Sequence, residues 1–533
     1  MKRILLLGCF FVSPQLFAGT DVGDLTGYGI IPALLAIFLA ICTKQVVLSL
    51  ITGLVSGSII HSLLYDSETY FFGIDKVFDF YLLNSISNSG HASILLFSLL
   101  IGGSIHIMTK MGAFNGLINW LSKYAKSKRS ALLITYFMGF FVFFDDYANT
   151  LVVGNTMQRI TDRFKISREK LAFIVDATAA PIASIAFVST WIGYEIQLIK
   201  QGLESANFTG DDSAYGIFLH AVPYSFYPII ILFFVLILIL TGKDFSIMKK
   251  FELKQSQKIS SEVEVVKSIH PIWAILPIVI LLFVTLFGIY FTGKVDNGIV
   301  NAIQTGDCYK GLIWGSSSCF VVVVIISLLT KNTISENVNW MFEGFKSLLP
   351  ALTILILAWG LNGVLEDLKL GKYIGYIMSN SNIPFYVIPV TTFLLSSIVA
   401  FSTGSSFSTM GILIPIVISV CLSFYGSEDF EYGIFYASIA SVLSGAVLGD
   451  HCSPISDTTV LSSMATGCNH INHVNSQLVY CLTSGGIAVL LILLHSVFSI
   501  NIGIIYALGI ALIWLIIKLL GGLEFNTTGN KNV

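Results

Sequence analysis

The sequence predicts an all-α membrane protein that crosses the bilayer many times. Its 533 residues are 55% hydrophobic and only 11% charged, whereas a soluble globular protein carries about 25% charged residues. Many apolar segments reach the ~20 residues that a helix needs to span a bilayer, for example residues 222–241 and 271–291. These runs are continuous rather than alternating, which excludes a transmembrane β-barrel.

The N-terminus has the form of a secretory signal peptide. Lys2 and Arg3 precede an apolar stretch, and the small residue Ala18 suits cleavage. We therefore expect residues 1–18 to be removed, with an uncleaved first helix as the alternative. N-terminal membrane helices are predicted over residues 27–108.

The distribution of lysine and arginine predicts the orientation of the chain. Residues 110–129, 158–170 and 242–270 hold five, five and six of them, and such residues concentrate in cytoplasmic loops. Residues 130–157 thus lie between two cytoplasmic loops, and these 28 residues are too few for two ordinary spans, which need about 40. We expect a hairpin that enters the membrane and returns to the same side. One long span with an exposed acidic end is the alternative.

The tip of this hairpin carries polar residues that a membrane segment rarely keeps without a use. Asp145 and Asp146 are adjacent and cannot both ionise cheaply in a low dielectric, so we expect one to act as an acid–base partner. Asn149 and Thr150 add neutral oxygens for Na+ or for a carboxylate substrate. Their alternative role is to allow close helix packing.

A second hairpin is predicted over residues 384–424, which lie between two outer loops. It should therefore enter the membrane from the opposite side. Its tip is uncharged and offers the hydroxyl groups of Ser405, Ser406, Ser408 and Thr409. Such a tip suits Na+ or resembles a cradle for a carboxylate.

Each hairpin is followed by a helix that a proline is expected to break. Residues 171–199 contain Asp176, five positions before Pro181. Residues 434–463 contain the polar run GDHCSPISDTTVLSS, with Pro454 in its middle. Proline frees backbone carbonyls, and these coordinate cations where a membrane helix is unwound.

The two halves of the chain are related by a weak internal repeat. A shift of 259 residues places Thr150 on Thr409, so the hairpin tips align without a gap. Because the predicted orientations of the halves are opposite, they form an inverted-topology repeat, which is a common plan of secondary transporters. The predicted segments are repeat cores at 109–241 and 348–476, a cytoplasmic loop at 242–270, connecting helices at 271–347 and C-terminal helices at 477–520.

Asp450 and Asp457 are the strongest candidates for the ion site. Pro454 between them implies that they flank a break instead of sharing one helical face. We expect Asp457 to ligate Na+ and Asp450 to exchange a proton or join the ligands, with Ser453 beside them. A carboxylate in a partly desolvated pocket binds H+ or Na+ in competition, which is a sufficient basis for exchange. Asp176 is a further candidate, and capping of a half-helix is the alternative role for either aspartate.

Other ionisable and aromatic residues are expected to have simpler roles. Glu195 and Glu366 lie near the ends of predicted spans, where we expect them at the membrane interface. His451 is a candidate pH sensor, although such a histidine more often satisfies a neighbouring polar group. Trp191 and Trp359 are expected at the interface or in packing.

The run GDHCSPISDTTVLSS, residues 449–463, resembles the signature of the NhaC-type Na+/H+ antiporter family, within the ion-transporter superfamily of hairpin-and-broken-helix exchangers. The run FFDDYANT, residues 143–150, adds to this resemblance, which covers roughly residues 27–520. It implies this fold and secondary active transport. Relatives include Na+/H+ exchangers, and similar proteins move amino acids or organic acids with Na+ or H+. Dimers are common in the superfamily.

We therefore expect a secondary transporter of the bacterial inner membrane that is not an enzyme and uses Na+ and H+ as coupling ions, without a cofactor. Na+/H+ exchange ranks first, and coupled carriage of an amino acid or carboxylate is the alternative. No basic and aromatic pattern indicates nucleic acid, and no nucleotide motif indicates an ATP-driven pump. An intramembrane metal enzyme is remote, because no HExxH-type pair is present and His470 and His473 are expected in a polar loop. The other imaginable zinc ligands are His451, Cys452 and Cys468.

Overall fold

The computed structural model describes most of the chain as helices. The described residues are 27–43, 45–65, 73–206, 208, 210, 213–255, 268–293, 302, 306–370, 373, 384–426 and 430–522. Within these ranges, nine helices are long and apolar enough to cross a bilayer. The prediction of an all-α protein with many spans is confirmed. The predicted signal peptide lies outside the described residues.

The first half of the chain, up to residue 255, contains mostly short and medium helices. They are η2 (Gly27–Gly29), α1 (Ile30–Thr43), α2 (Val46–Tyr65), α3 (Ile74–Lys76), the π-helical η4 (Val77–Leu82), α4 (Leu83–Ser87), α5 (Ser89–Met111), α6 (Ala113–Ser122), α7 (Lys128–Phe141), α8 (Asp146–Arg163), α9 (Arg168–Ala177), α10 (Ala180–Ala183), α11 (Thr190–Ser205), α12 (Ala214–Ala221), η5 (Val222–Tyr224), α13 (Phe226–Thr241) and α14 (Ser246–Gln255). η5 and α13 are bent against each other, so that α12, η5 and α13 form a span with a 45° bend.

The second half contains longer helices. They are α15 (Ile272–Thr292), α17 (Cys308–Leu329), α18 (Ile334–Asp367), η7 (Phe385–Val387), α20 (Ile388–Thr403), α21 (Ser406–Leu422), α22 (Tyr432–Cys452), α23 (Asp457–Thr466), α24 (His470–Phe498) and α25 (Ile502–Leu520). The predicted boundary at residue 348 falls inside α18, which begins with a capping box between Thr333 and Glu336 and continues through Pro350.

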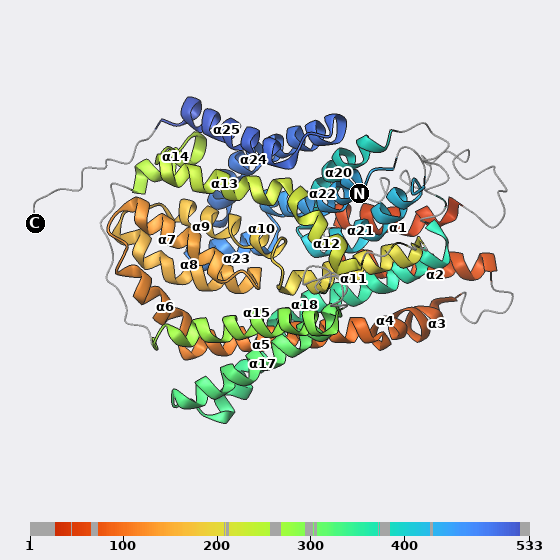
Figure 1. Cartoon of the computed structure of the whole chain (residues 1–533), viewed down its shortest axis with the longest axis horizontal. Helices are drawn as coiled ribbons and strands as arrows, with labels where there is room; N and C mark the ends of the chain where they lie inside the picture. The colour runs from red at the N-terminus through yellow and green to blue at the C-terminus, as the bar shows by residue number, and fades with distance from the viewer. Residues whose placement is uncertain are drawn as a thin grey trace, which may run out of the picture.

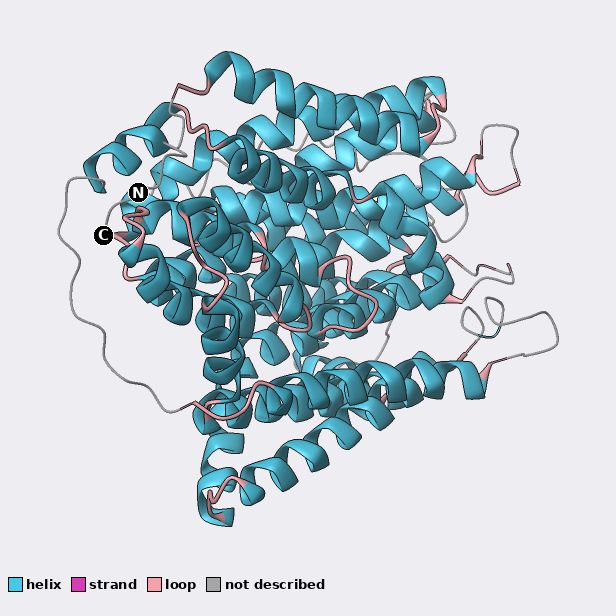
Figure 2. Cartoon of the chain, turned by 60° about the vertical axis from the view of Figure 1, so that its left-hand side comes forward, coloured by secondary structure: helices cyan, strands magenta, loops and turns pink. Residues whose placement is uncertain are grey.

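The helices form layers around a central group of short elements (Figure 1). α5, α15, α17 and α18 pack together on one side, and α13, α24 and α25 pack together on the other. α10, α11, α22 and α23 lie between these layers. The view in Figure 2 shows only helices and their connecting loops in the described part of the chain.

Polar caps and a glycine set the hairpin turns. Asp145 caps α8, accepting a hydrogen bond from the Ala148 backbone N–H at 2.7 Å. Ser405 caps α21 in the same way, and Gly404 before it has a φ of 67°, which favours glycine. In each hairpin, the first helix (α7 or α20) therefore ends at the polar tip, and the second helix (α8 or α21) begins there. Their return to one side of a membrane stays a prediction.

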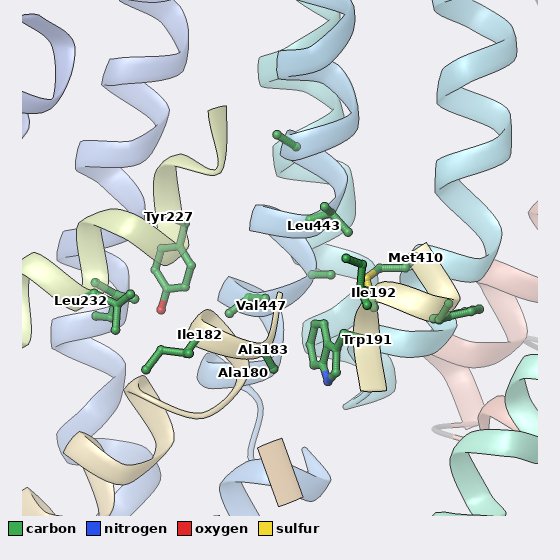
Figure 3. Packing of buried hydrophobic residues seen from close by; sticks show 14 of the residues in the cluster. Ala180, Ile182, Ala183, Trp191, Ile192, Tyr227, Leu232, Met410, Leu443 and Val447 are labelled. Atoms are coloured by element: carbon green, nitrogen blue, oxygen red, sulfur yellow. The ribbon is translucent and has the colours of Figure 1, made fainter. Parts of the chain in front are cut away.

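The core between the layers is tightly packed and apolar. Figure 3 shows Trp191 and Ile192 of α11 beside Met410 of α21, with Ala183 of α10 and Val447 of α22 nearby. All five of these side chains are buried. The broken helix of the first half, with α10 and α11, thus packs against α21 of the second hairpin and against α22 of the second half.

Candidate functional site

Two interruptions of the backbone define the candidate site. The first separates α9 from α11 and contains the single turn α10, in which Pro181 occupies the first turn. The second separates α22 from α23, and Pro454 lies within it. Both interruptions lie in the interior in Figure 1.

Asp450 lies in the last turn of α22 and is bonded across the second break. One carboxylate oxygen accepts from the Ser456 hydroxyl at 2.8 Å, and the other accepts from the Thr458 hydroxyl at 2.5 Å. Only 1% of Asp450 is exposed, and Ser453 beside it is fully buried. Hydroxyl donors therefore compensate the buried carboxylate, without a lysine or arginine in these contacts.

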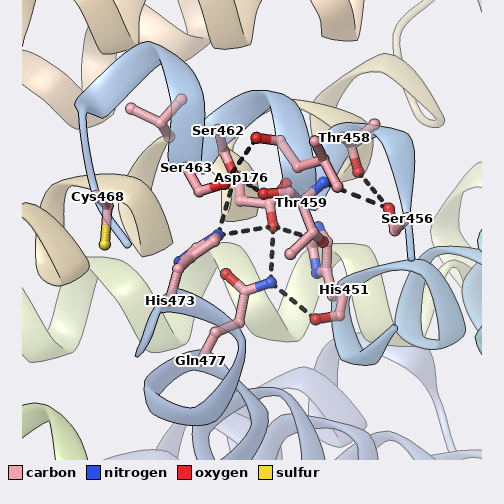
Figure 4. Close-up of polar contacts among 12 residues, drawn as sticks. Asp176, His451, Ser456, Thr458, Thr459, Ser462, Ser463, Cys468, His473 and Gln477 are labelled. Carbon is pink, nitrogen blue, oxygen red and sulfur yellow. Dashed lines mark hydrogen bonds and ion pairs between the residues drawn. The ribbon is translucent and has the colours of Figure 1, made fainter. Parts of the chain in front are cut away.

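Asp176, at the end of α9, joins the first break to the second. Its Oδ2 atom accepts from Thr459 Oγ1 at 3.2 Å and from Gln477 Nε2 at 2.6 Å. His473 Nε2 lies 3.5 Å from the same oxygen. All four side chains are fully buried, and Figure 4 shows them converging on Asp176.

The histidines extend this network toward α13 and along α23. His451 Nδ1 lies 2.9 Å from the Tyr227 hydroxyl, and its backbone carbonyl accepts from Gln477 at 2.8 Å. His473 Nε2 also lies 2.9 Å from the Ser462 hydroxyl. We call Asp176, Asp450, Ser456, Thr458, Thr459, His473 and Gln477 the central polar cluster. Among the described residues, no group of three or more His, Cys, Asp or Glu side chains has the geometry of a metal centre.

The tip of the first hairpin forms a second polar group. Asp145 accepts from the Thr190 hydroxyl at 3.0 Å, which joins the tip to the start of α11. Asn149 donates to the backbone carbonyls of Gly139 at 2.8 Å and Thr178 at 3.0 Å. Asp146 and Thr150 are also buried. This tip therefore packs against the broken helix of its own half.

The hydroxyls of the second hairpin bond mainly to the backbone. Ser408 and Thr409 donate to the Ser405 carbonyl at 3.1 and 3.0 Å. Ser406 donates to the Ala446 carbonyl of α22 at 3.2 Å. A Cβ on Gly404 would lie 2.6 Å from the carbonyl oxygen of Ile455, so this tip abuts the second break.

A cavity reaches the site from one side. It has a volume of about 530 Å³ and is lined by Asp145, Tyr147, Asn155, His106 and Asn115, among others. Asp145 and Tyr147 also line a separate pocket of about 20 Å³ together with Tyr194, whose hydroxyl donates to the Phe407 carbonyl at 2.7 Å. The rings of Tyr194 and Phe407 are stacked with centroids 5.4 Å apart. Phe407 lines the same small pocket, so little space remains between α11 and α21 on this side of Asp145.

Comparison with known families assigns the chain. A model of the Na+/H+ antiporter family matches residues 182–497, which is more than half of the sequence. The chain belongs to the Na+/H+ antiporter family. It is therefore a secondary transporter with many membrane spans and not an enzyme. A model of the C4-dicarboxylate anaerobic carrier matches residues 30–148.

Individual relatives agree with this assignment. An uncharacterised protein of Haemophilus influenzae is 33% identical over 471 residues, covering 86% of this chain and 88% of the relative. Shorter similarities involve an uncharacterised Na+/H+ antiporter of H. influenzae, 29% identical over 26% of this chain and 28% of the relative, and the high-affinity gluconate transporter of Escherichia coli, 24% identical over 30% of this chain and 32% of the relative.

A solved structure shares the fold of this antiporter family member. The structure of Neisseria gonorrhoeae MtrF, described as illuminating a class of antimetabolite efflux pumps, superposes with a TM-score of 0.57. It covers 88% of this chain and 96% of the other at 14% identity.

The predicted site residues fall into separate places in the structure. Asp176 and Asp450 meet in the central polar cluster, whereas Asp145 and Asn149 lie at the first hairpin tip. Ser405, Ser406, Ser408 and Thr409 lie at the second tip. Asp457 is the first residue of α23, and its side chain lies outside the described part of the structure.

Two expectations about individual residues are wrong, and two residues that contact Asp176 are not predicted from the sequence to belong to the ion site. His470 and His473 lie in the first turn of α24 and not in a loop. Glu195 is completely buried and not interfacial. His473 and Gln477, which contact Asp176, are spaced four residues apart at the start of an apolar helix. That spacing, which places polar groups on one helical face, is the signal that reveals them.

Proposed function

We propose that the protein exchanges Na+ for H+ across a bacterial inner membrane, and that Asp176 and Asp450 form its ion site. The observation that supports this most directly concerns two consecutive threonines of α23. Thr458 bonds to Asp450, and Thr459 bonds to Asp176. Two carboxylates from the two backbone breaks are thereby held at one short segment, away from water. Buried membrane carboxylates are costly and mark ion pathways.

The chemistry of this cluster suits both ions. Na+ is a hard cation that takes carboxylate, hydroxyl and backbone carbonyl oxygens. The hydroxyls of Ser456, Thr458 and Thr459 now donate to carboxylates, but each oxygen keeps lone pairs that face a cation after rotation of the O–H bond. In the absence of Na+, a proton on one of these carboxylates or on another buried acid balances the charge, so the two ions exclude each other. Asp457 remains our prediction for a further Na+ ligand.

The large cavity supports a route to this site from the cytoplasm. Its lining includes His106 and Thr109 near the C-terminal end of α5, which leads into the lysine-rich residues 110–129. These residues are predicted to be cytoplasmic. Leu461 of α23 lines the same cavity, so its wall includes the helix that carries Thr458 and Thr459. In this proposal the structure is the inward-facing state.

The same observations support the inverted repeat as part of the proposal. Each hairpin tip contacts the break of its own half. Asp145 bonds to Thr190 after the first break, and Gly404 abuts Ile455 in the second. Two such units of opposite orientation would bring both breaks to the middle of the membrane.

Fluorescence of a pH-sensitive dye in inside-out vesicles tests the proposal. After respiration acidifies the interior, Na+ should alkalinise it, and Li+ and K+ serve to define selectivity. Asp176→Asn and Asp450→Asn should abolish the response. Asp79→Asn, which removes an exposed carboxylate, is the matched control. Wild-type responses in both cluster variants would place the ion site elsewhere.

Transport of an organic acid is the second candidate function. The dicarboxylate-carrier match at residues 30–148 and the partial similarity to a gluconate transporter favour it. A cavity of about 530 Å³ is also larger than an ion requires. One observation argues against it, because an organic anion would need a buried cation as its partner. Lys170 is the one lysine or arginine counted as buried among the described residues, and it is paired with Asp244 at 2.6 Å. Na+-dependent uptake of radiolabelled succinate or gluconate, without Na+-driven proton movement, would favour this candidate over exchange.

A further inference from the structure

Glu195 is a buried acid that the central polar cluster does not use. It lies on α11, its exposed fraction is 0%, and neither carboxyl oxygen has a hydrogen-bond partner within the described residues. By contrast, Asp145, Asp176 and Asp450 each accept hydrogen bonds. An ionised carboxylate without compensation is very costly to bury, whereas the protonated acid is far less so. Burial without a partner therefore favours the protonated form of Glu195 in this conformation.

The position of Glu195 places it between the two halves of the protein. Gly202, seven residues later and thus on nearly the same helical face, packs against Ile418 of α21, which lies 2.8 Å from a Cβ built on Gly202. The face of α11 that carries Glu195 is therefore directed toward α21. Tyr194, the preceding residue, binds the Phe407 carbonyl at the start of α21.

The ionisable groups near this interface do not compensate the acid. Those on α11 and on the helices packed against it are His91, His106 and Lys110 on α5, Tyr194, Lys200 and Glu204 on α11, Tyr215 and His220 on α12, Glu336, Glu343, Lys346, Glu366 and Asp367 on α18, and Cys421 on α21. None of them hydrogen bonds to Glu195. Lys200, on the same helix, pairs instead with Glu204 at 3.7 Å.

A polar cavity lies on the other face of α11 from this acid. It has a volume of about 220 Å³, and its lining includes Gln197, Gln201 and Glu204 of α11. Gln197 is two residues beyond Glu195, so the two side chains project from nearly opposite faces of α11. In the packed state the cavity water is therefore kept from the carboxyl group by the helix itself. If α11 separates from α21, water that enters between the two helices reaches Glu195, and the cost of ionising it falls.

We propose that Glu195 carries the proton of the exchange cycle. It holds the proton while α11 packs on α21, and it releases the proton when the two helices separate and water enters. Within the described residues neither carboxyl oxygen of the acid has a hydrogen-bond partner, and an unsatisfied buried polar group costs stability, so packing alone does not account for it. The proposal rests on the proposed Na+/H+ exchange and adds to it a proton site separate from the central polar cluster.

Purified protein in liposomes tests this with two assays on the same preparation. Counterflow of radioactive Na+ reports Na+ binding and alternation without net proton movement, and a trapped pH dye reports Na+-driven proton movement. Glu195→Gln, which imitates the protonated acid in shape and charge, should keep the counterflow and lose the proton movement. Glu195→Asp should keep both, with the pH profile shifted. Glu204→Gln, at the exposed end of the same helix, is the control.

The outcomes separate the two proposals. Wild-type protein without either activity would overturn Na+/H+ exchange itself. Wild-type protein with both activities and a Glu195→Gln variant that also has both would overturn the role of Glu195. Loss of both activities in well-folded Glu195→Gln protein would overturn it too, because the residue would then serve Na+ movement. Infrared spectroscopy gives a check independent of transport, since a carbonyl band of a protonated acid should be present in wild-type protein and absent from Glu195→Gln.

Discussion

The hydroxyl of Thr459 donates to Asp176 across 3.2 Å, although the two residues lie 283 positions apart in the chain. This contact joins the break after α9 to the break before α23. A movement of α23 at the second break is therefore transmitted to the carboxylate of Asp176 at the first break.

Replacement of Thr459 by valine tests that contact with little change in volume. The variant removes a donor to Asp176 and an oxygen that we propose for Na+. A hydrogen bond to a charged group contributes about 1.5–3 kcal/mol, so the half-saturating Na+ concentration should rise about tenfold or more. Dye fluorescence over a Na+ titration measures it. Thr483→Val is the control, because in the described part of the chain that hydroxyl bonds only to Val479 of its own helix. An unchanged Na+ requirement in Thr459→Val would contradict the proposed site.

Two glycines of positive φ provide a matched test of the second hairpin tip. Gly404 and Gly426 have φ values of 67° and 85°, so alanine at either costs about 1–2 kcal/mol of backbone strain. A Cβ on Gly404 would also strike the Ile455 carbonyl, whereas a Cβ on Gly426 has nothing within 4 Å. Gly404→Ala should therefore abolish transport, and Gly426→Ala should leave it intact. Equal transport by both variants would show that the tip need not touch the break.

Lys170 and Asp244 form a fully buried ion pair at 2.6 Å, and Tyr480 donates to the same carboxylate at 3.1 Å. Lys170→Met leaves that charge buried without its lysine and should destabilise the fold by about 3–5 kcal/mol. The double variant Lys170→Met/Asp244→Leu should recover most of the lost stability. Thermal unfolding in detergent, followed by tryptophan fluorescence, measures both. A single variant as stable as wild type would mean that water reaches Asp244.

Asn149 is the polar link between the two arms of the first hairpin and the first break. Asn149→Ala leaves the Gly139 and Thr178 carbonyls without its amide donor, at about 1–3 kcal/mol for each unsatisfied group. The midpoint of thermal unfolding should fall accordingly. Asn155→Ala, on the same helix but exposed, should unfold at the wild-type temperature. Similar midpoints for both variants would argue against a structural role for Asn149.

Local sequence patterns predict most of the helical elements. Apolar runs identify the spans, and Asp145 and Ser405 mark the starts of α8 and α21 because each caps the next helix. Pro454 likewise falls in the interruption before α23. These features depend on neighbours in the sequence, so composition and spacing reveal them.

Contacts between distant segments are not encoded in such patterns. Nothing local to Asp176 indicates that Gln477 and Thr459 will surround it. The prediction that Glu195 lies at the membrane interface is wrong for a related reason. Its place near the end of a predicted span indicates the membrane surface, whereas in the structure α11 packs against α21, α12 and α5 and buries the acid. Residues at the site thus follow from the fold and not from periodicity alone.

Asp145 and Tyr147 line both the large cavity of about 530 Å³ and the pocket of about 20 Å³ at the Tyr194–Phe407 contact, so the space narrows sharply on that side. A compound bulky enough to fill that cavity could occupy it without crossing to the other face of the membrane. Blockade by such a compound would depend on which face of the membrane it is applied to, and added substrate on the opposite face would relieve it only by drawing the transporter into the other conformation.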